Sequence, residues 1–256
     1  MTEHIAVNRA GGICRISIQR PEKKNALTHA MYTIMANAID QAETDHDTRV
    51  VLITGTRDCF TAGNDLNDFL QNPPTGPDSP VIRFLHAIST ARKAVVAAVN
   101  GPAIGIGTTL LLHCDLAYAG PNARFELPFM KLGLVPEGGS SKLLPELMGY
   151  HRACELLMLG ETLDARGAAE LGLVNAVFEA DAYLPRAQAA AERLAALPPA
   201  ALRKTKALLK APHLESISQT ITKESHMFLE QLRSPEAREA MQAVLERREP
   251  DFSKFT

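Results

Sequence analysis

The sequence contains few cysteines and no closely spaced pair of them. Its 256 residues include four, without any CxxC motif: Cys14, Cys59, Cys114 and Cys154. This spacing argues against a disulfide framework or a zinc knuckle and favours buried, reduced thiols. The eight histidines show no HExxH motif or other ligand spacing, so we expect no metal. Reduced thiols suit the cytoplasm, which is the predicted location.

Long apolar runs and an excess of one charge are also missing. No run of about 18 apolar residues occurs, which argues against a membrane-spanning helix. The N-terminal stretch shows no cationic segment followed by an apolar one, and the final SKFT is not a peroxisomal address. The net charge is −2, and the longest basic clusters, Lys23-Lys24 and Arg247-Arg248, lack interleaved aromatic residues. We therefore expect neither a membrane nor a nucleic-acid partner.

The sequence does contain enough apolar residues, 46%, for a large core. Its first half alternates strand-like and helix-like segments, which predicts a layered α/β architecture. Segment 72–80, with four prolines and a glycine, is expected to be an irregular loop. From about Gly149 onward the pattern is almost wholly helical, with apolar positions recurring every three or four residues. These amphipathic helices must cover a core or a partner chain.

Two glycine-containing segments each indicate a strand that is followed by a turn and a helix. They are CFTAGNDL at 59–66, where Asp65 can cap the following helix, and NGPAIGIGTTL at 100–110. Backbone N–H groups at the start of a helix lack partners, so two such turns facing each other would form an oxyanion hole. For either turn alone, an ordinary strand-to-helix connection is the favoured interpretation. A dinucleotide fingerprint is not supported, because the glycine spacing does not satisfy GxGxxG.

The segment LGLVPEGGSS, at 132–141, places a single carboxylate at a tight bend. Glu137 lies between Pro136 and the pair Gly138-Gly139. Proline and glycine usually mark solvated turns, so a solvent-facing bend is the simplest interpretation. At such a bend, replacing Glu137 should change folding stability little. The alternative is a carboxylate held at the mouth of an apolar pocket, with an apolar wall formed by Leu127, Phe129, Leu132 and Val135.

Three segments together resemble the successive signatures of the crotonase (enoyl-CoA hydratase/isomerase) superfamily. They are FTAGNDL at 60–66, NGPAIGIGTTLLLHCDLAYA at 100–119 and ARFELPFMKLGLVPEGGSSKLL at 123–144, and RPEKKNALT at 20–28 resembles the acyl-CoA-binding segment. The resemblance implies a repeated ββα spiral core over 1–195 and a C-terminal helical trimerisation region over 196–256. It also implies acyl-CoA thioester substrates and a homotrimer or a hexamer made of two trimers. No separate cofactor is expected, since coenzyme A is part of the substrate.

The resemblance also implies roles for individual residues. The oxyanion hole would be the backbone N–H groups of Asn64 and Ile106, although the family usually carries glycine at the second place. Glu137 would be the catalytic base, as in peroxisomal-type Δ3,Δ2-enoyl-CoA isomerases. The substrate would be bound by Lys24, Ala26, Ala62, Gly63, Asp65, Leu66, Ile104, Gly105, Thr109, Phe129 and Pro136.

Departures from the family pattern bear on the reaction. Hydratases of the superfamily use two glutamates, and the matching positions here are Thr109 and Phe129, neither of which can be a carboxylate base. Glu126 is close in sequence, but we expect it to point elsewhere from its strand. The sequence therefore favours an isomerase with Glu137 as its single base. A hydratase-like enzyme and a non-catalytic acyl-CoA-binding homologue stay open, whereas a hydrolase is disfavoured because PEGGSS is not GxSxG.

Overall fold

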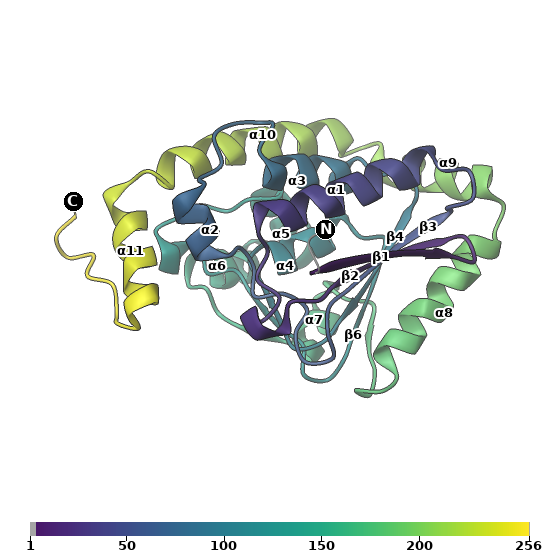
Figure 1. The fold of residues 1–256 in the computed structure, drawn as a ribbon, viewed down its shortest axis with the longest axis horizontal. Coiled ribbons are helices and arrows are strands. Elements are labelled where there is room, and N and C mark those ends of the chain that lie inside the picture. Colours follow the sequence, from purple (N-terminus) through teal and green to yellow (C-terminus); the bar gives the residue numbers. More distant parts are fainter. Residues whose placement is uncertain (1–3, 256) are drawn as a thin grey trace.

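The computed structural model, which describes residues 4–255, contains two β-sheets surrounded by helices (Figure 1). The larger sheet has the order β1-β2-β3-β4-β6-β9 and the smaller one β5-β7-β8. The larger sheet consists of β1 (Ile5–Ala10), β2 (Ile13–Ile18), β3 (Val50–Thr54), β4 (Ala94–Val99), β6 (Leu116–Ala119) and β9 (Ala176–Val177). The smaller sheet consists of β5 (Pro102–Ile104), β7 (Arg124–Glu126) and β8 (Leu163–Asp164). Only the β1–β2 hairpin and the β7–β8 pair are antiparallel among the described strands.

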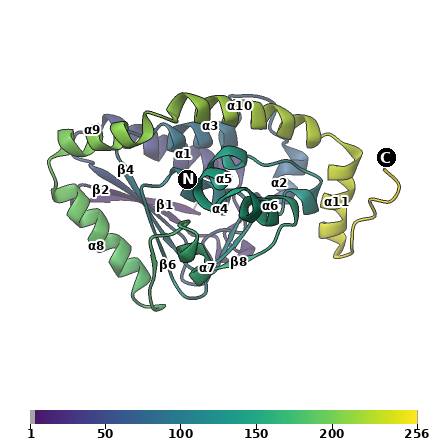
Figure 2. The same ribbon diagram turned by 180° about the vertical axis from the view of Figure 1, so that it is seen from behind.

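Helices cover both faces of the larger sheet and extend beyond it (Figure 2). In the first part of the chain they are η1 (Pro21–Lys23), α1 (His29–Thr44), α2 (Leu66–Gln71), α3 (Pro80–Ser89), α4 (Ile106–Thr109), η2 (Leu110–His113) and η3 (Met130–Leu132). They continue as α5 (Ser140–Met148), α6 (Tyr150–Met158), α7 (Ala165–Glu170), α8 (Tyr183–Ala196), α9 (Pro199–Lys210), α10 (Leu214–Gln231) and α11 (Pro235–Glu246). No helix within residues 4–255 has both the length and the apolar character needed to cross a membrane.

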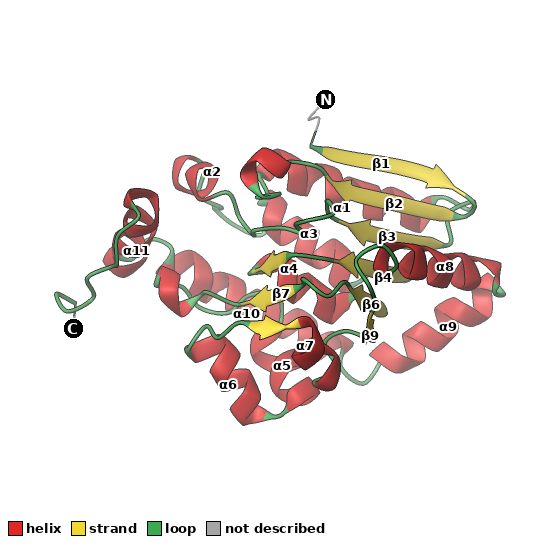
Figure 3. Ribbon diagram, turned by 90° about the horizontal axis from the view of Figure 1, so that it is seen from below, coloured by secondary structure: helices red, strands yellow, loops and turns green. Residues whose placement is uncertain are grey.

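Alternation along the central strands explains the layers. In β3, Val51 and Ile53 belong to the large core shared with α1 and α3, whereas Val50 and Leu52 belong to the core under α8. Successive side chains of a strand point to opposite faces, so an uninterrupted apolar run suits a strand covered on both sides. Figure 3 shows α8 lying across the face of the sheet opposite α1 and α3.

The elements predicted from the pattern are present with few changes. The loop between α2 and α3 spans 72–79, and Asp65 caps α2 by accepting bonds from the N–H groups of Asn67 and Asp68. The prediction of an almost wholly helical chain after Gly149 missed β8 and β9. Each of these strands has two residues, which is too short to leave a periodic signal. The division at residue 195 stays a prediction.

A buried asparagine fixes the loop that follows β3. Asn25 adopts a positive φ of 56° and is fully buried. Its amide nitrogen donates to the carbonyls of Cys59 (2.7 Å) and Phe60 (3.1 Å), and its amide oxygen accepts from the N–H of Arg20 (2.7 Å). These bonds attach the loop to the segment before α1. Asparagine suits this position because few other residues both tolerate this backbone conformation and form bonds of this kind.

We expect Asn25→Ala to lower the free energy of unfolding, because it leaves buried backbone groups without partners. The loss should be about 1 to 3 kcal/mol, measured by urea denaturation. Asn72→Ala, which removes an exposed asparagine side chain, is the control and should change it little. Equal effects of the two substitutions would contradict the role given to Asn25.

Candidate active site

Parallel pairing of β3 with β4 brings the two glycine-containing turns together. Both strands end at the same edge, and the segments that follow remain bonded. Thr61 pairs with Ala103 in a parallel bridge, and the N–H of Ile104 donates to the carbonyl of Thr61 at 3.0 Å. The carboxyl edge of a parallel sheet is a common place for ligand sites. Residues about forty positions apart in the sequence thereby become neighbours.

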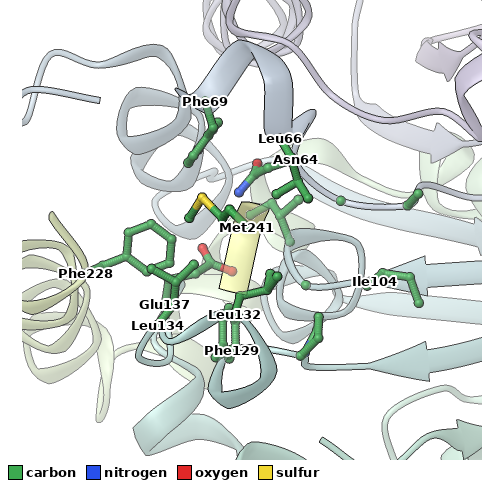
Figure 4. Close-up of a pocket in the computed structure, with 15 residues that line it drawn as sticks. Asn64, Leu66, Phe69, Ile104, Phe129, Leu132, Leu134, Glu137, Phe228 and Met241 are labelled. Carbon is green, nitrogen blue, oxygen red and sulfur yellow. The ribbon is translucent and has the colours of Figure 1, made fainter. Parts of the chain in front are cut away.

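A cavity of about 110 Å³ opens where these two turns meet the bend that carries Glu137 (Figure 4). Nine of the residues predicted for the site line it: Ala62, Gly63, Asn64, Leu66, Ile104, Gly105, Ile106, Phe129 and Glu137. The remaining lining residues are Phe69, Pro128, Leu132, Leu134, Phe228 and Met241. Glu137 is the one titratable side chain in this described lining, and most of the other side chains are apolar.

Two backbone N–H groups border this cavity without an acceptor among residues 4–255. They belong to Asn64 and to Ile106, the first residue of α4. Gly105, directly before α4, has a φ of 55° and a ψ of −116°, which a residue with a side chain rarely adopts. The phenol of Tyr32 donates to the side-chain oxygen of Asn64 and so fixes that side chain as well. Within the described residues, both N–H groups are thus available to an acceptor.

The carboxyl group of Glu137 is removed from water. The residue is 7% exposed, and the hydroxyl of Thr109 donates to Oε1 at 2.6 Å. Its other oxygen, Oε2, is buried and has no partner within the described part of the chain. Burial raises the pKa of Glu137 to about 8, against the lowering effect of the Thr109 hydrogen bond and with a smaller upward contribution from the charge of Glu224. The expectation of a solvent-facing bend was therefore wrong, because the apolar side chains of the cavity enclose the turn.

Several predicted residues lie outside the cavity lining. Lys24 is exposed, and Ala26 and Pro136 are half-buried. Thr109 contacts Glu137 rather than the cavity itself, and Asp65 forms an ion pair with Arg20 at 2.7 Å in addition to capping α2.

The predicted apolar wall is half correct. Phe129 and Leu132 line the cavity, but Leu127 and Val135 pack into the core instead. Leu134, the residue before Val135, lines the cavity in its place. Glu126 pairs with Lys131 at 2.9 Å and lies outside the lining, as we expected for a residue that points elsewhere from its strand.

Sequence reasoning missed the contribution of the C-terminal helices. Phe228 of α10 and Met241 of α11 complete one side of the cavity (Figure 4). Helical periodicity indicated that these faces are buried but carried no signal for which surface they cover.

A second, smaller cavity of about 20 Å³ also borders Glu137. It shares Asn64, Phe69, Glu137 and Phe228 with the first and extends to Pro74 in the loop between α2 and α3. That loop therefore borders the site.

Comparisons with known proteins agree with this geometry. The sequence model of the enoyl-CoA hydratase/isomerase family matches residues 8–254. Enoyl-CoA delta isomerase 2 of Rattus norvegicus is 37% identical over 83% of this chain, which spans 56% of the length of that relative. The 2,3-dehydroadipyl-CoA hydratase of Escherichia coli is 32% identical over 97% of this chain and 98% of its own. The solved structure of Pseudomonas aeruginosa OdaA superposes with a TM-score of 0.94 at 50% identity, over 96% of this chain and all of the other.

The fold and these likenesses place the chain in the crotonase superfamily. The chain belongs to the enoyl-CoA hydratase/isomerase family. The crotonase-like α/β fold predicted from the three motifs is confirmed.

Burial of Glu137 predicts a stability that depends on pH. Its pKa of about 8 in the folded protein exceeds the ordinary value of 4.5. Between these values the folded protein holds a proton that the unfolded chain has lost, so its stability falls as the pH rises from about 4.5 to 8. Glu137→Gln removes this dependence. Its free energy of unfolding relative to wild type should therefore increase between pH 5 and pH 8, by up to roughly 1.4 kcal/mol per pH unit.

Urea denaturation at several pH values measures this difference. Glu146→Gln, at an exposed position on α5, should leave the pH slope of wild type unchanged. A constant difference between Glu137→Gln and wild type across the range would contradict the raised pKa.

Proposed function

We propose that this protein is a Δ3,Δ2-enoyl-CoA isomerase, which moves the double bond of a 3-enoyl-CoA to the 2-trans position. The observation that supports this most directly is the single carboxyl group of Glu137 in an apolar cavity that also holds two acceptor-free N–H groups. The relatives include both isomerases and hydratases, so the specific reaction is argued from the site.

The reaction needs one base and one site for negative charge. Glu137 removes a proton from C2, and the electron pair of that C–H bond forms a C1–C2 double bond while the carbonyl π pair moves to the thioester oxygen. When the carbonyl forms again, the C1–C2 pair becomes the C2–C3 double bond, and the C3–C4 pair takes the proton that Glu137 returns at C4. The intermediate dienolate carries its charge on the thioester oxygen. The N–H groups of Asn64 and Ile106 stabilise that oxygen as its charge develops. One carboxyl group placed between C2 and C4 can serve both transfers.

The two positions at which hydratases carry glutamates favour this reaction over hydration. Phe129 forms part of the apolar wall, and Thr109 donates a hydrogen bond to Glu137. Water addition would need an acid and a base held on opposite sides of a water molecule. Among the described lining residues, Glu137 alone can exchange a proton at neutral pH, so the second group is missing.

We extend the proposal to the rest of the substrate and to the assembly. Coenzyme A would pass Lys24 and Ala26. Their segment is attached to the cavity lining, because the N–H of Ala62 donates to the carbonyl of Lys24 at 2.9 Å. No cofactor beyond the coenzyme A of the substrate is needed for a proton shift. We propose a homotrimer or a dimer of trimers, located in the cytoplasm.

Replacing the base should abolish isomerisation. We expect Glu137→Gln to lower kcat for 3-hexenoyl-CoA by about 100- to 10,000-fold, because the amide cannot take the proton. Conversion to the 2-enoyl product is followed directly, and Glu126→Gln, which removes a nearby carboxylate outside the cavity, is the control that keeps activity.

The same experiment separates the alternatives. Hydration of crotonyl-CoA that survives Glu137→Gln would identify a hydratase-like enzyme instead. Binding of acyl-CoA without any exchange of the C2 proton in deuterated water would identify a non-catalytic homologue.

A second substitution tests the oxyanion donors. Ile106→Pro removes one N–H group at the first position of α4, where proline fits a helix and where Gly105 has no Cβ to clash with the ring. We expect kcat to fall by about 100- to 1,000-fold, the usual effect of losing one such donor. Ile106→Ala keeps the N–H group and shortens the side chain, so it should retain most of the activity. Equal losses in both variants would contradict a role for the N–H group.

A further inference from the structure

The peptide bond between Gly138 and Gly139, one residue beyond Glu137, is held at both ends by buried side chains. Nε2 of His113 lies 2.7 Å from the carbonyl oxygen of Gly138, and the N–H of Gly139 donates to Oε2 of Glu224 at 2.6 Å. This oxygen and this nitrogen belong to the same peptide unit. Two residues that are 111 positions apart in the sequence, on η2 and on α10, therefore hold one peptide between them.

The protonation states of the two side chains follow from their partners. A carbonyl oxygen can only accept, so Nε2 of His113 carries the hydrogen. Burial, with smaller contributions from the positive charges of Lys210 and Lys206, lowers the pKa of His113 to about 4 against the raising effect of its hydrogen bond to Gly138, so the ring is neutral at pH 7. Burial raises the pKa of Glu224, and the hydrogen bonds that it accepts oppose this rise. It accepts from the N–H groups of Gly139 and Ser141 and from the Ser141 hydroxyl, which is the bonding pattern of an ionised carboxylate.

The bend has little stiffness of its own at this point. Gly138 and Gly139 both adopt positive φ, at 68° and 77°, and glycine reaches many other conformations at similar energy. Glu137 is joined to this peptide through Gly138, so a shift of the peptide would also move Glu137. Reacting groups that are displaced by about 1 Å can lose roughly 100-fold in rate. The side-chain contacts to the peptide supply the rigidity that two glycines lack.

We propose that His113 and Glu224 are positioning residues, which hold the Gly138–Gly139 peptide and thereby keep the carboxyl group of Glu137 aligned with the N–H groups of Asn64 and Ile106. Glu224 acts on the base in a second way, through its negative charge. This inference rests on the proposed isomerase function, although one of its tests does not require activity.

The electrostatic part can be traced to named groups. The titratable side chains around the bend are Tyr32 on α1, His113 on η2 and Glu224 on α10. Tyr32 and His113 are neutral at pH 7, so Glu224 supplies the charge that acts on Glu137 from this side. Its charge contributes to the raised pKa of Glu137. Removing that charge should let Glu137 ionise at lower pH.

Paired substitutions at His113 test the mechanical part. His113→Leu removes the donor, and we expect kcat for 3-hexenoyl-CoA to fall by about 10- to 100-fold with KM little changed. His113→Gln can place an amide N–H near the position of Nε2, so it should restore kcat to within a few-fold of wild type. A kcat that is unchanged in a folded His113→Leu protein, or reduced equally in both variants, would overturn the role of His113.

Glu224→Gln tests the electrostatic part, with Glu146→Gln on the solvent side of α5 as its control. The acidic limb of the kcat profile should move to lower pH in Glu224→Gln, because the negative charge that raises the pKa of Glu137 is removed. The control should keep the wild-type profile.

A direct titration of Glu137 separates this inference from the proposed function. Infrared absorption of the protonated carboxyl group is recorded as a function of pH. The spectrum of Glu137→Gln is subtracted from that of wild type, and the spectrum of the double variant Glu137→Gln/Glu224→Gln is subtracted from that of Glu224→Gln. We expect the midpoint of Glu137 to fall in the Glu224→Gln background. An inactive wild type with this shift would reject the isomerase and keep the electrostatic coupling, whereas an active wild type without the shift would reject the coupling alone.

Discussion

The site depends on keeping one carboxyl group out of water. A glutamate placed among Phe129, Leu134 and Phe228 is costly to ionise, and this cost is what brings its pKa close to neutrality. A base with such a pKa can remove a proton from carbon and return it, since both of its protonation states are accessible at physiological pH. An exposed carboxylate at the same bend would be a much weaker base. The apolar wall is therefore part of the chemistry as well as part of the core.

The rest of the fold can be understood as the support for that group. Parallel pairing of β3 with β4 places two turns side by side, and each contributes one N–H group at the edge of the cavity. Thr109, which stands where a hydratase would carry a glutamate, satisfies one oxygen of Glu137 and leaves the other free for a substrate. In the proposed isomerase, the hydroxyl at this position is a hydrogen-bond donor to the base, where a carboxylate would be a second acid.

Local patterns in the sequence predicted the layered α/β elements, whereas the resemblance of its motifs to the crotonase superfamily supplied nine of the fifteen residues that line the cavity. Glycine-containing turns, the cap at Asp65 and the apolar run of β3 are signals carried by a few adjacent residues, and each was found where it was expected. The enclosure of Glu137 could not be predicted in this way, because Phe228 and Met241 lie about 90 and 100 residues downstream. The contact of Glu224 with Gly139 has the same character. Such contacts are set by how helices dock, which periodicity does not encode.

Because α10 and α11 contribute to the cavity, the site is completed late in the synthesis of the chain. Synthesis proceeds from the N-terminus, so both turns and the bend at Glu137 emerge from the ribosome well before Phe228 and Met241 do. Until those helices dock, water reaches the carboxyl group, which then behaves as an ordinary glutamate. In the proposed isomerase, catalytic competence would therefore require α10 and α11 to dock, because Phe228 and Met241 complete one side of the cavity.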